Sequence, residues 1–75
     1  MKTRKHLKIS RITAGFSQSQ LSTIVGVSQQ TIAKWERGIT TPSQFGHLRA
    51  LEDALDEPAD MLFPDIFEND TALAE

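Results

Sequence analysis

A three-residue break, Gly26-Val27-Ser28, separates two short stretches of helical pattern and constrains the fold of this chain more than any other feature. Glycine adopts the positive φ that a tight turn between helices needs, and Ser28 is a good N-cap for the stretch that follows. Apolar residues recur at helical spacing on both sides, as Leu21, Ile24 and Val25 before the break and as Ile32 and Trp35 after it. The pattern predicts two helices, at about 18–25 and 29–37, that pack through these residues.

Glycine, proline and capping residues also divide the rest of the chain into short helical segments, and signals for strands are nearly absent. We expect further helices at about 3–14, from a Ser43 cap to about 55, and at 58–63, with a stop at Pro64. Their expected core residues are Leu7, Ile9 and Ile12 in the first and Phe45, Leu48, Leu51, Ala54 and Leu55 in the fourth. The prediction is an all-α bundle of five short helices, with a domain at 1–64 and an acidic tail at 65–75.

Composition excludes several classes of function. The chain has no cysteine, and His6 and His47 lack the spacing of metal ligands, so we expect no disulfide, metal or cofactor. None of the serines is accompanied by a histidine–carboxylate pair, which argues against an enzyme. No apolar run approaches 18 residues and no apolar block follows the basic start, so we expect no membrane span, no secretory signal and a cytoplasmic location. A chain of 75 residues also has no room for a separate ligand domain, so no small-molecule ligand is expected.

The net charge of −2 conceals a strong segregation of charge. Residues 1–49 carry eight basic side chains and one acidic one, whereas residues 50–75 carry nine acidic side chains and no basic one. The basic part is suited to face the phosphates of a nucleic acid while the acids lie elsewhere. Among the basic residues near the N-terminus, Lys2, Arg4 and Lys5 are predicted to contact phosphates.

The predicted helix at 29–37 has a polar face that suits the major groove of DNA. If Ile32 and Trp35 face the core, the opposite stripe presents Gln29, Gln30, Ala33, Lys34 and Arg37. Glutamine pairs with N6 and N7 of adenine, and lysine donates to O6 and N7 of guanine. We therefore predict that Gln29, Gln30 and Lys34 read bases in double-stranded DNA, as the second helix of a helix-turn-helix does.

The stretch FSQSQLSTIVGVSQQTIAKWERG, followed by TTPS, LRALEDAL and DMLF, resembles the lambda-repressor-like or Xre family of prokaryotic and phage regulators, which includes the Cro proteins. The resemblance covers about residues 5–63. It implies a compact helical DNA-binding domain in a prokaryotic or phage-encoded protein. The sequence departs from the family pattern in small ways. Asp56 stands at the usual glycine between the last two helices, and Ser10 replaces a common leucine, which suggests packing through Ile9 or Ile12.

The resemblance also implies roles for individual residues. Gln18 is expected to bind a phosphate and to steady the recognition helix, which is the predicted helix at 29–37. The end of that helix and the following loop are expected to touch the DNA backbone, which implies contacts by Arg37, Thr40 and Thr41. Arg11 and Glu36 occupy the positions of a structural ion pair.

Two functions fit this sequence. The first is a Cro-like or small phage- or plasmid-type repressor that binds a near-palindromic operator as a homodimer. For its dimer surface we predict Phe63, Ile66 and Phe67, apolar residues that a five-helix bundle does not obviously cover. The alternative is an antitoxin-like or restriction–modification controller protein, whose acidic C-terminal third docks a basic partner protein and whose DNA binding is autoregulatory.

Overall fold

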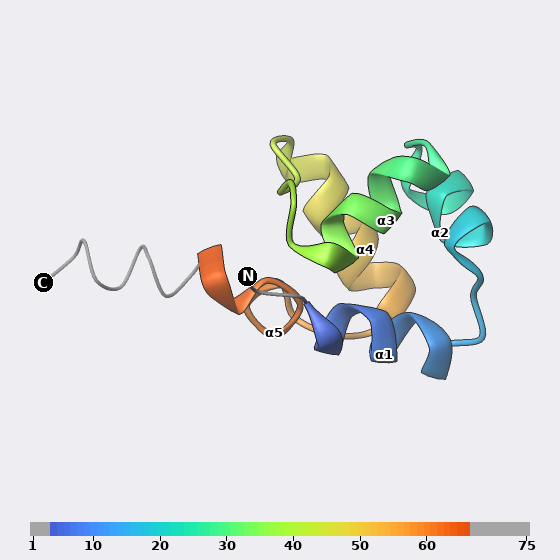
Figure 1. The fold of residues 1–75 in the computed structure, drawn as a ribbon. Coiled ribbons are helices and arrows are strands. Elements are labelled where there is room, and N and C mark those ends of the chain that lie inside the picture. The colour runs from blue at the N-terminus through green and yellow to red at the C-terminus, as the bar shows by residue number, and fades with distance from the viewer. Residues whose placement is uncertain (1–3, 67–75) are drawn as a thin grey trace, which may run out of the picture.

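The computed structural model describes residues 4–66, which form five labelled helices and a short helical turn at 64–66, with no strand in that range (Figure 1). In chain order they are α1 (Lys5–Thr13), α2 (Gln18–Val25), α3 (Gln29–Arg37), α4 (Phe45–Leu55) and α5 (Ala59–Leu62). The predicted all-α bundle is confirmed, and α2 and α3 have the predicted bounds. Pro64 does not stop the chain from being helical, since residues 64–66 form a further helical turn. Proline fits the first turn of a helix, where its missing N–H has no partner to lose.

One apolar core holds the helices together. α2 packs against α3 and α4, while α1 packs against α3 and α5. Every helix contributes, and the buried apolar residues are Leu7, Leu21, Val25, Ile32, Trp35, Leu51, Leu55, Leu62 and Phe63. Burial of a large apolar side chain stabilises the fold by roughly 1.5–3 kcal/mol, so this cluster is the main source of stability.

Three isoleucines that we expected in the core face solvent instead. Ile9 and Ile12 in α1 are 58% and 56% exposed, and Ile24 in α2 is 49% exposed. α1 buries the face that carries Leu7 and Arg11, because the Arg11 guanidinium binds acceptors inside the protein. This rotation of α1 satisfies the buried charge of Arg11 and leaves Ile9 and Ile12 in solvent, against the apolar pattern.

The start of α4 also differs from the prediction. The helix begins at Phe45 after an N-cap at Gln44 that makes no side-chain capping bond, so Ser43 is not the cap. Phe45, which we expected to be buried, is 74% exposed. The first turn of α4 lies outside the core, and burial begins only at His47 and Leu48.

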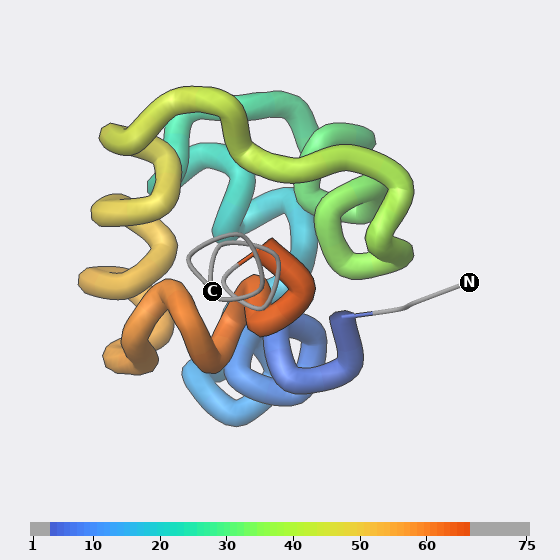
Figure 2. Tube along the Cα trace, turned by 90° about the vertical axis from the view of Figure 1, so that its left-hand side faces the viewer, coloured from blue at the N-terminus to red at the C-terminus, as the bar shows by residue number. Residues whose placement is uncertain are grey.

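The segment after α4 returns the chain to α1. Asp56 adopts the left-handed conformation, with φ of 55°, that the glycine of the family pattern would supply, and aspartate is among the few other residues that tolerate it. Pro58 is the N-cap of α5, and Glu52 accepts a hydrogen bond of 2.7 Å from the amide of Ala59 at the start of that helix. α5 then lies against both α1 and α4, as Figure 2 shows. It ends before Phe63, one residue earlier than predicted.

The packed part of the chain extends past the predicted domain boundary at residue 64. Asp65 bonds to Arg4, and Ile66 packs against the core. The two ends of the described chain therefore lie side by side (Figure 1). The rest of the predicted tail lies outside the described residues.

Candidate nucleic-acid interface

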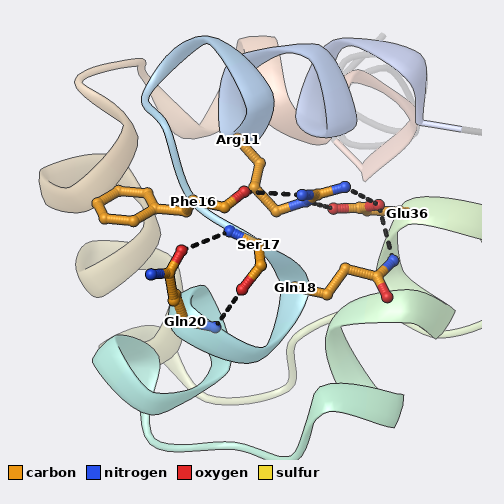
Figure 3. Close-up of polar contacts among 6 residues, drawn as sticks. All are labelled: Arg11, Phe16, Ser17, Gln18, Gln20 and Glu36. Carbon is orange, nitrogen blue, oxygen red and sulfur yellow. Dashed lines mark hydrogen bonds and ion pairs between the residues drawn. The ribbon is translucent and has the colours of Figure 1, made fainter.

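Local hydrogen bonds set the start of α2 and the turn to α3. The Ser17 hydroxyl accepts from the Gln20 amide at 3.0 Å, while the Gln20 side chain accepts from the Ser17 amide at 2.8 Å (Figure 3). This reciprocal pair is a capping box, which satisfies two amides that a helix leaves without partners. Gly26 ends α2 with φ of +90°, and the Ser28 hydroxyl caps α3 by accepting from the Thr31 amide at 3.2 Å. These short-range signals build the turn that was predicted from the sequence.

The N-terminal end of α3 presents the predicted base-reading residues to solvent. Gln29, Gln30 and Lys34 are all exposed, whereas Ile32 and Trp35 are buried on the other side of the helix. Within residues 4–66, the side chains of Gln29, Gln30 and Lys34 make no hydrogen bond or ion pair. Their donors and acceptors are therefore available to a ligand, as direct readout of bases requires.

The C-terminal end of α3 is held by a buried ion pair. Arg11 Nε donates to Glu36 Oε2 at 2.5 Å, and Arg11 also donates to the Phe16 carbonyl at 2.8 Å (Figure 3). The Gln18 amide nitrogen donates to Glu36 Oε1 at 3.1 Å. The ion pair expected between Arg11 and Glu36 is thus present in the structure. It joins α1, the start of α2 and the end of α3, so it fixes the direction in which the other end of α3 points.

The bond to Glu36 bears on the predicted role of Gln18. The side-chain amide of glutamine has two hydrogens, and Glu36 takes one of them. A phosphate contact by Gln18 must therefore use the second hydrogen. Such a contact stays a prediction. The bond from Gln18 to Glu36, by contrast, connects the start of α2 directly to the end of α3.

Arg4 does not have the role that we predicted for it. The residue is only 5% exposed, and its guanidinium donates to Asp65 and to two main-chain carbonyls. A buried cation with four of its five N–H donors bonded to the protein is not placed to meet a DNA phosphate. The prediction failed because local sequence does not distinguish an arginine that faces solvent from one whose partner lies 61 residues away.

Other basic residues lie around a hollow of about 440 Å³ between the starts of α1 and α2 and the end of α3. It is lined by Arg4, Lys5, Lys8, Gln18, Ala33, Glu36 and Arg37. Lys5, Lys8 and Arg37 are exposed, so they supply positive charge at its edge. We did not predict a contact by Lys8, but its spacing of three residues from Lys5 places both on one side of α1. Because Glu36 is paired, the charge of this hollow is positive overall.

The loop after α3 carries two more predicted backbone contacts. Thr40 and Thr41 are both exposed, and Pro42 beside them is buried. Lys2, the remaining predicted contact, lies outside the described residues. The structure therefore places Lys5, Arg37, Thr40 and Thr41 where solvent reaches them, and their contacts with phosphates stay predictions.

The predicted dimer surface needs a correction. Phe63 is fully buried, and its ring packs against Trp35 with centroids 6.4 Å apart. It is therefore a core residue and cannot meet a second copy. Ile66 is half-buried against the same core, and Phe67 lies outside the described residues.

The two histidines have protein partners. His6 Nε2 lies 3.2 Å from a carboxylate oxygen of Glu57, and the His47 ring centroid lies 6.0 Å from that of Trp35. In residues 4–66, no three histidine, cysteine or acidic side chains gather as metal ligands would. The described helices also include none that is long and apolar enough to cross a membrane.

Comparison with known proteins gave one match. A family model described as Helix-turn-helix matches residues 7–62, which run from the first turn of α1 to the end of α5. No curated protein and no solved structure matches the chain. The match spans both ends of α3 and the helices that hold it.

Proposed function

The chain belongs to the lambda-repressor-like, or Xre, helix-turn-helix family of DNA-binding regulators, and from this premise we propose that it is a sequence-specific transcriptional repressor. Its ligand is double-stranded DNA, and its operator is a near-palindrome bound by a homodimer. The mode of action is that of a Cro-like or small phage- or plasmid-type repressor, in the cytoplasm of a prokaryotic host. We assign it no catalytic activity.

The exposed N-terminal end of α3 is the observation that carries this proposal. Gln29 and Gln30 are adjacent, exposed and unpaired within the described residues, at the end of the helix that enters the major groove in this motif. Lys34 follows one turn later and adds a donor for guanine. The ion pair of Arg11 and Glu36 supports the same interpretation, because a side chain reads bases selectively only when its helix is held in one orientation.

The homodimer is proposed because one short helix reads too few base pairs to select an operator. Two copies related by a two-fold axis place their recognition helices about 34–36 Å apart, one turn of DNA, on two half-sites. Lys5, Arg37, Thr40 and Thr41 would position each copy on the phosphates, without reading sequence. With Phe63 in the core, the dimer surface must use other residues, of which Ile66 is the described candidate.

The alternative of a partner-docking antitoxin or controller protein receives less support. Three acids of the C-terminal third already have partners within the protein, since Glu52 caps α5, Glu57 meets His6 and Asp65 binds Arg4. Only Asp53, Asp56 and Asp60 remain exposed among the acids in residues 50–66. We therefore favour DNA over a basic protein as the main partner.

Selection of binding sites from a random pool of duplexes tests the proposal. The protein is first shown to be folded by circular dichroism, and the selection is made at a stated salt concentration, since phosphate contacts make affinity depend steeply on salt. We expect enrichment of a near-palindrome with half-sites about 10 base pairs apart.

A Gln29→Ala/Gln30→Ala variant should enrich no consensus while keeping its fold, and Thr13→Ala, an exposed change on α1, serves as the matched control. Enrichment of a single half-site by the unaltered protein would support DNA recognition and contradict the homodimer. No enrichment by the folded protein would overturn the proposal and revive the partner-docking alternative.

A further inference from the structure

Arg4 makes an unusual set of contacts for a residue just before the first helix. Its backbone amide donates to the Glu36 carbonyl at 2.9 Å. Its guanidinium donates to the carbonyls of Trp35 at 2.7 Å and Thr40 at 2.6 Å, and to both carboxylate oxygens of Asp65 at 3.1 and 2.9 Å. The guanidinium carbon also lies 4.8 Å from the centre of the Phe63 ring. One side chain, 3% exposed, thus joins the end of α3, the following loop and the C-terminal segment.

The contacts at the end of α3 have a clear physical basis. The last carbonyls of a helix lack partners within the helix and carry partial negative charge. Arg4 supplies donors to two of them, on Trp35 and Glu36, and places a positive charge at the same end. Asp65 pairs with that charge in a two-bond arrangement, which orients the planar guanidinium. Asp65 therefore helps to determine where the other donors of Arg4 point.

The bond to the Thr40 carbonyl matters because few other contacts restrain the loop of residues 40–43. Among the described residues, the bond from Arg4 to the Thr40 carbonyl is the one hydrogen bond made by residues 40–43. Burial of Pro42 is the other visible restraint. The exposed side chains of Thr40 and Thr41 are the predicted contacts with the DNA backbone, and their placement depends on the backbone that carries them.

We propose that Arg4 is a positioning residue for DNA binding, which sets the loop of residues 40–43 through the Thr40 carbonyl and is itself oriented by Asp65. This inference rests on the proposed function, because it assumes that the loop meets DNA. It couples the C-terminal segment to the DNA-contacting loop, so a change at Asp65 alters affinity for DNA without touching the DNA. Arg4 acts through the loop and not as a phosphate ligand.

Asp65→Asn is the main test, because asparagine keeps the shape of the side chain and removes its charge. Asp53→Asn, at an exposed position on α4, is the matched control with the same change in net charge. The probe is a duplex of about 30 base pairs that contains the site enriched by the unaltered protein. Removal of an acid by itself strengthens binding to a polyanion slightly, so the proposal predicts an effect of the opposite sign for Asp65→Asn.

We expect Asp65→Asn to weaken binding to this duplex by about 3- to 10-fold, the size of coupling between residues in contact. Binding by Asp53→Asn should be unchanged or slightly tighter. The slope of affinity against salt should stay the same, because no cation that meets a phosphate has been removed. In the protein without DNA, hydrogen exchange at the amides of Gly38 and Ile39, which bond to the end of α3, should become faster.

A double-mutant cycle tests whether the effect passes through the loop. Thr40→Ala should weaken binding by a smaller factor in the Asp65→Asn background than in the unaltered protein, because the loop there is already displaced. If Asp65→Asn fails to fold, Arg4→Lys carries the same measurements, since lysine keeps the charge but cannot reach all the acceptors.

Equal or tighter binding by Asp65→Asn overturns the proposal, and so does full additivity with Thr40→Ala. A fall in the salt slope for Arg4→Gln, which removes the charge, by about the value of one phosphate contact, would mark Arg4 as a direct ligand and overturn it as well. If the unaltered protein itself enriches no duplex, the proposed function fails and this inference fails with it. That result differs from one in which the unaltered protein binds and the variants bind equally well.

Discussion

The two ends of α3 are built in opposite ways. At the C-terminal end, Glu36 is buried against Arg11 and Gln18, and Arg4 bonds to the last carbonyls. At the N-terminal end, the Ser28 hydroxyl caps the helix, and the adjacent glutamines face solvent. Residues far away in the chain hold the C-terminal end, whereas the N-terminal end exposes its glutamines to solvent, and we call it the open end.

This difference separates stability from recognition. A buried charge network contributes a fixed geometry, and the loss of one partner is costly because the other charge is left unpaired. Exposed side chains on a helix surface contribute little to the free energy of unfolding, so they can be replaced to suit a different ligand without loss of stability. Changes at the two ends should therefore affect different measurements.

The largest effect is expected from Glu36→Gln. This change leaves the buried Arg11 guanidinium without its counter-charge, which should lower the free energy of unfolding by about 3–5 kcal/mol. Urea denaturation followed by circular dichroism measures the loss. Glu57→Gln is the control, because its pair with His6 is partly exposed and should be worth less than about 1 kcal/mol. Equal losses in the two variants would contradict the contrast between the ends of α3.

A smaller effect, on binding alone, is expected from Gln29→Ala. Loss of a pair of hydrogen bonds to one base should weaken binding to the enriched duplex by about 1–3 kcal/mol and relax the preference at one position of the half-site. The midpoint of urea denaturation should not move, since the side chain is exposed. Unchanged affinity and unchanged preference would remove Gln29 from the set of base-reading residues.

The smallest effect is expected from Ser28→Ala, which removes the cap at the open end of α3. Loss of the bond to the Thr31 amide should cost about 1 kcal/mol of stability. Ser43→Ala is the matched control, because no capping bond is made by Ser43 and its removal should change the urea midpoint little. If both serine variants lost the same stability, the capping bond at Ser28 would not be the cause.

Sequence reasoning succeeded where the signals are local. The cap at Ser28 and the glycine between α2 and α3 act within a few residues, and the structure has both helices at their predicted bounds. It failed at Ser43, whose residue type suits a cap but whose chain does not become helical until Phe45. A capping residue is a preference, and the packing of the helix that follows decides whether it is used.

The candidate site divides in the same way. The stripe with Gln29 and Gln30 follows from helical spacing once Ile32 and Trp35 face the core, so the sequence alone predicts it. The burial of Phe63 does not follow from local spacing, because its neighbours in the core come from distant parts of the chain. The ion pair of Arg11 and Glu36 was expected only through resemblance to a family.

Residue types and their spacing were sufficient to establish an all-α chain, the turn between α2 and α3 and the polar face of α3, since each depends on atoms a few residues apart. They did not establish which charges lie inside. Arg4 and Lys5 are neighbours of similar charge, yet Arg4 is buried against Asp65 and Lys5 is exposed. The environment of a long cationic side chain depends on the acceptors that folding brings to it, and those of Arg4 come from residues 35, 40 and 65. The partner of a charge is therefore a property of the folded molecule.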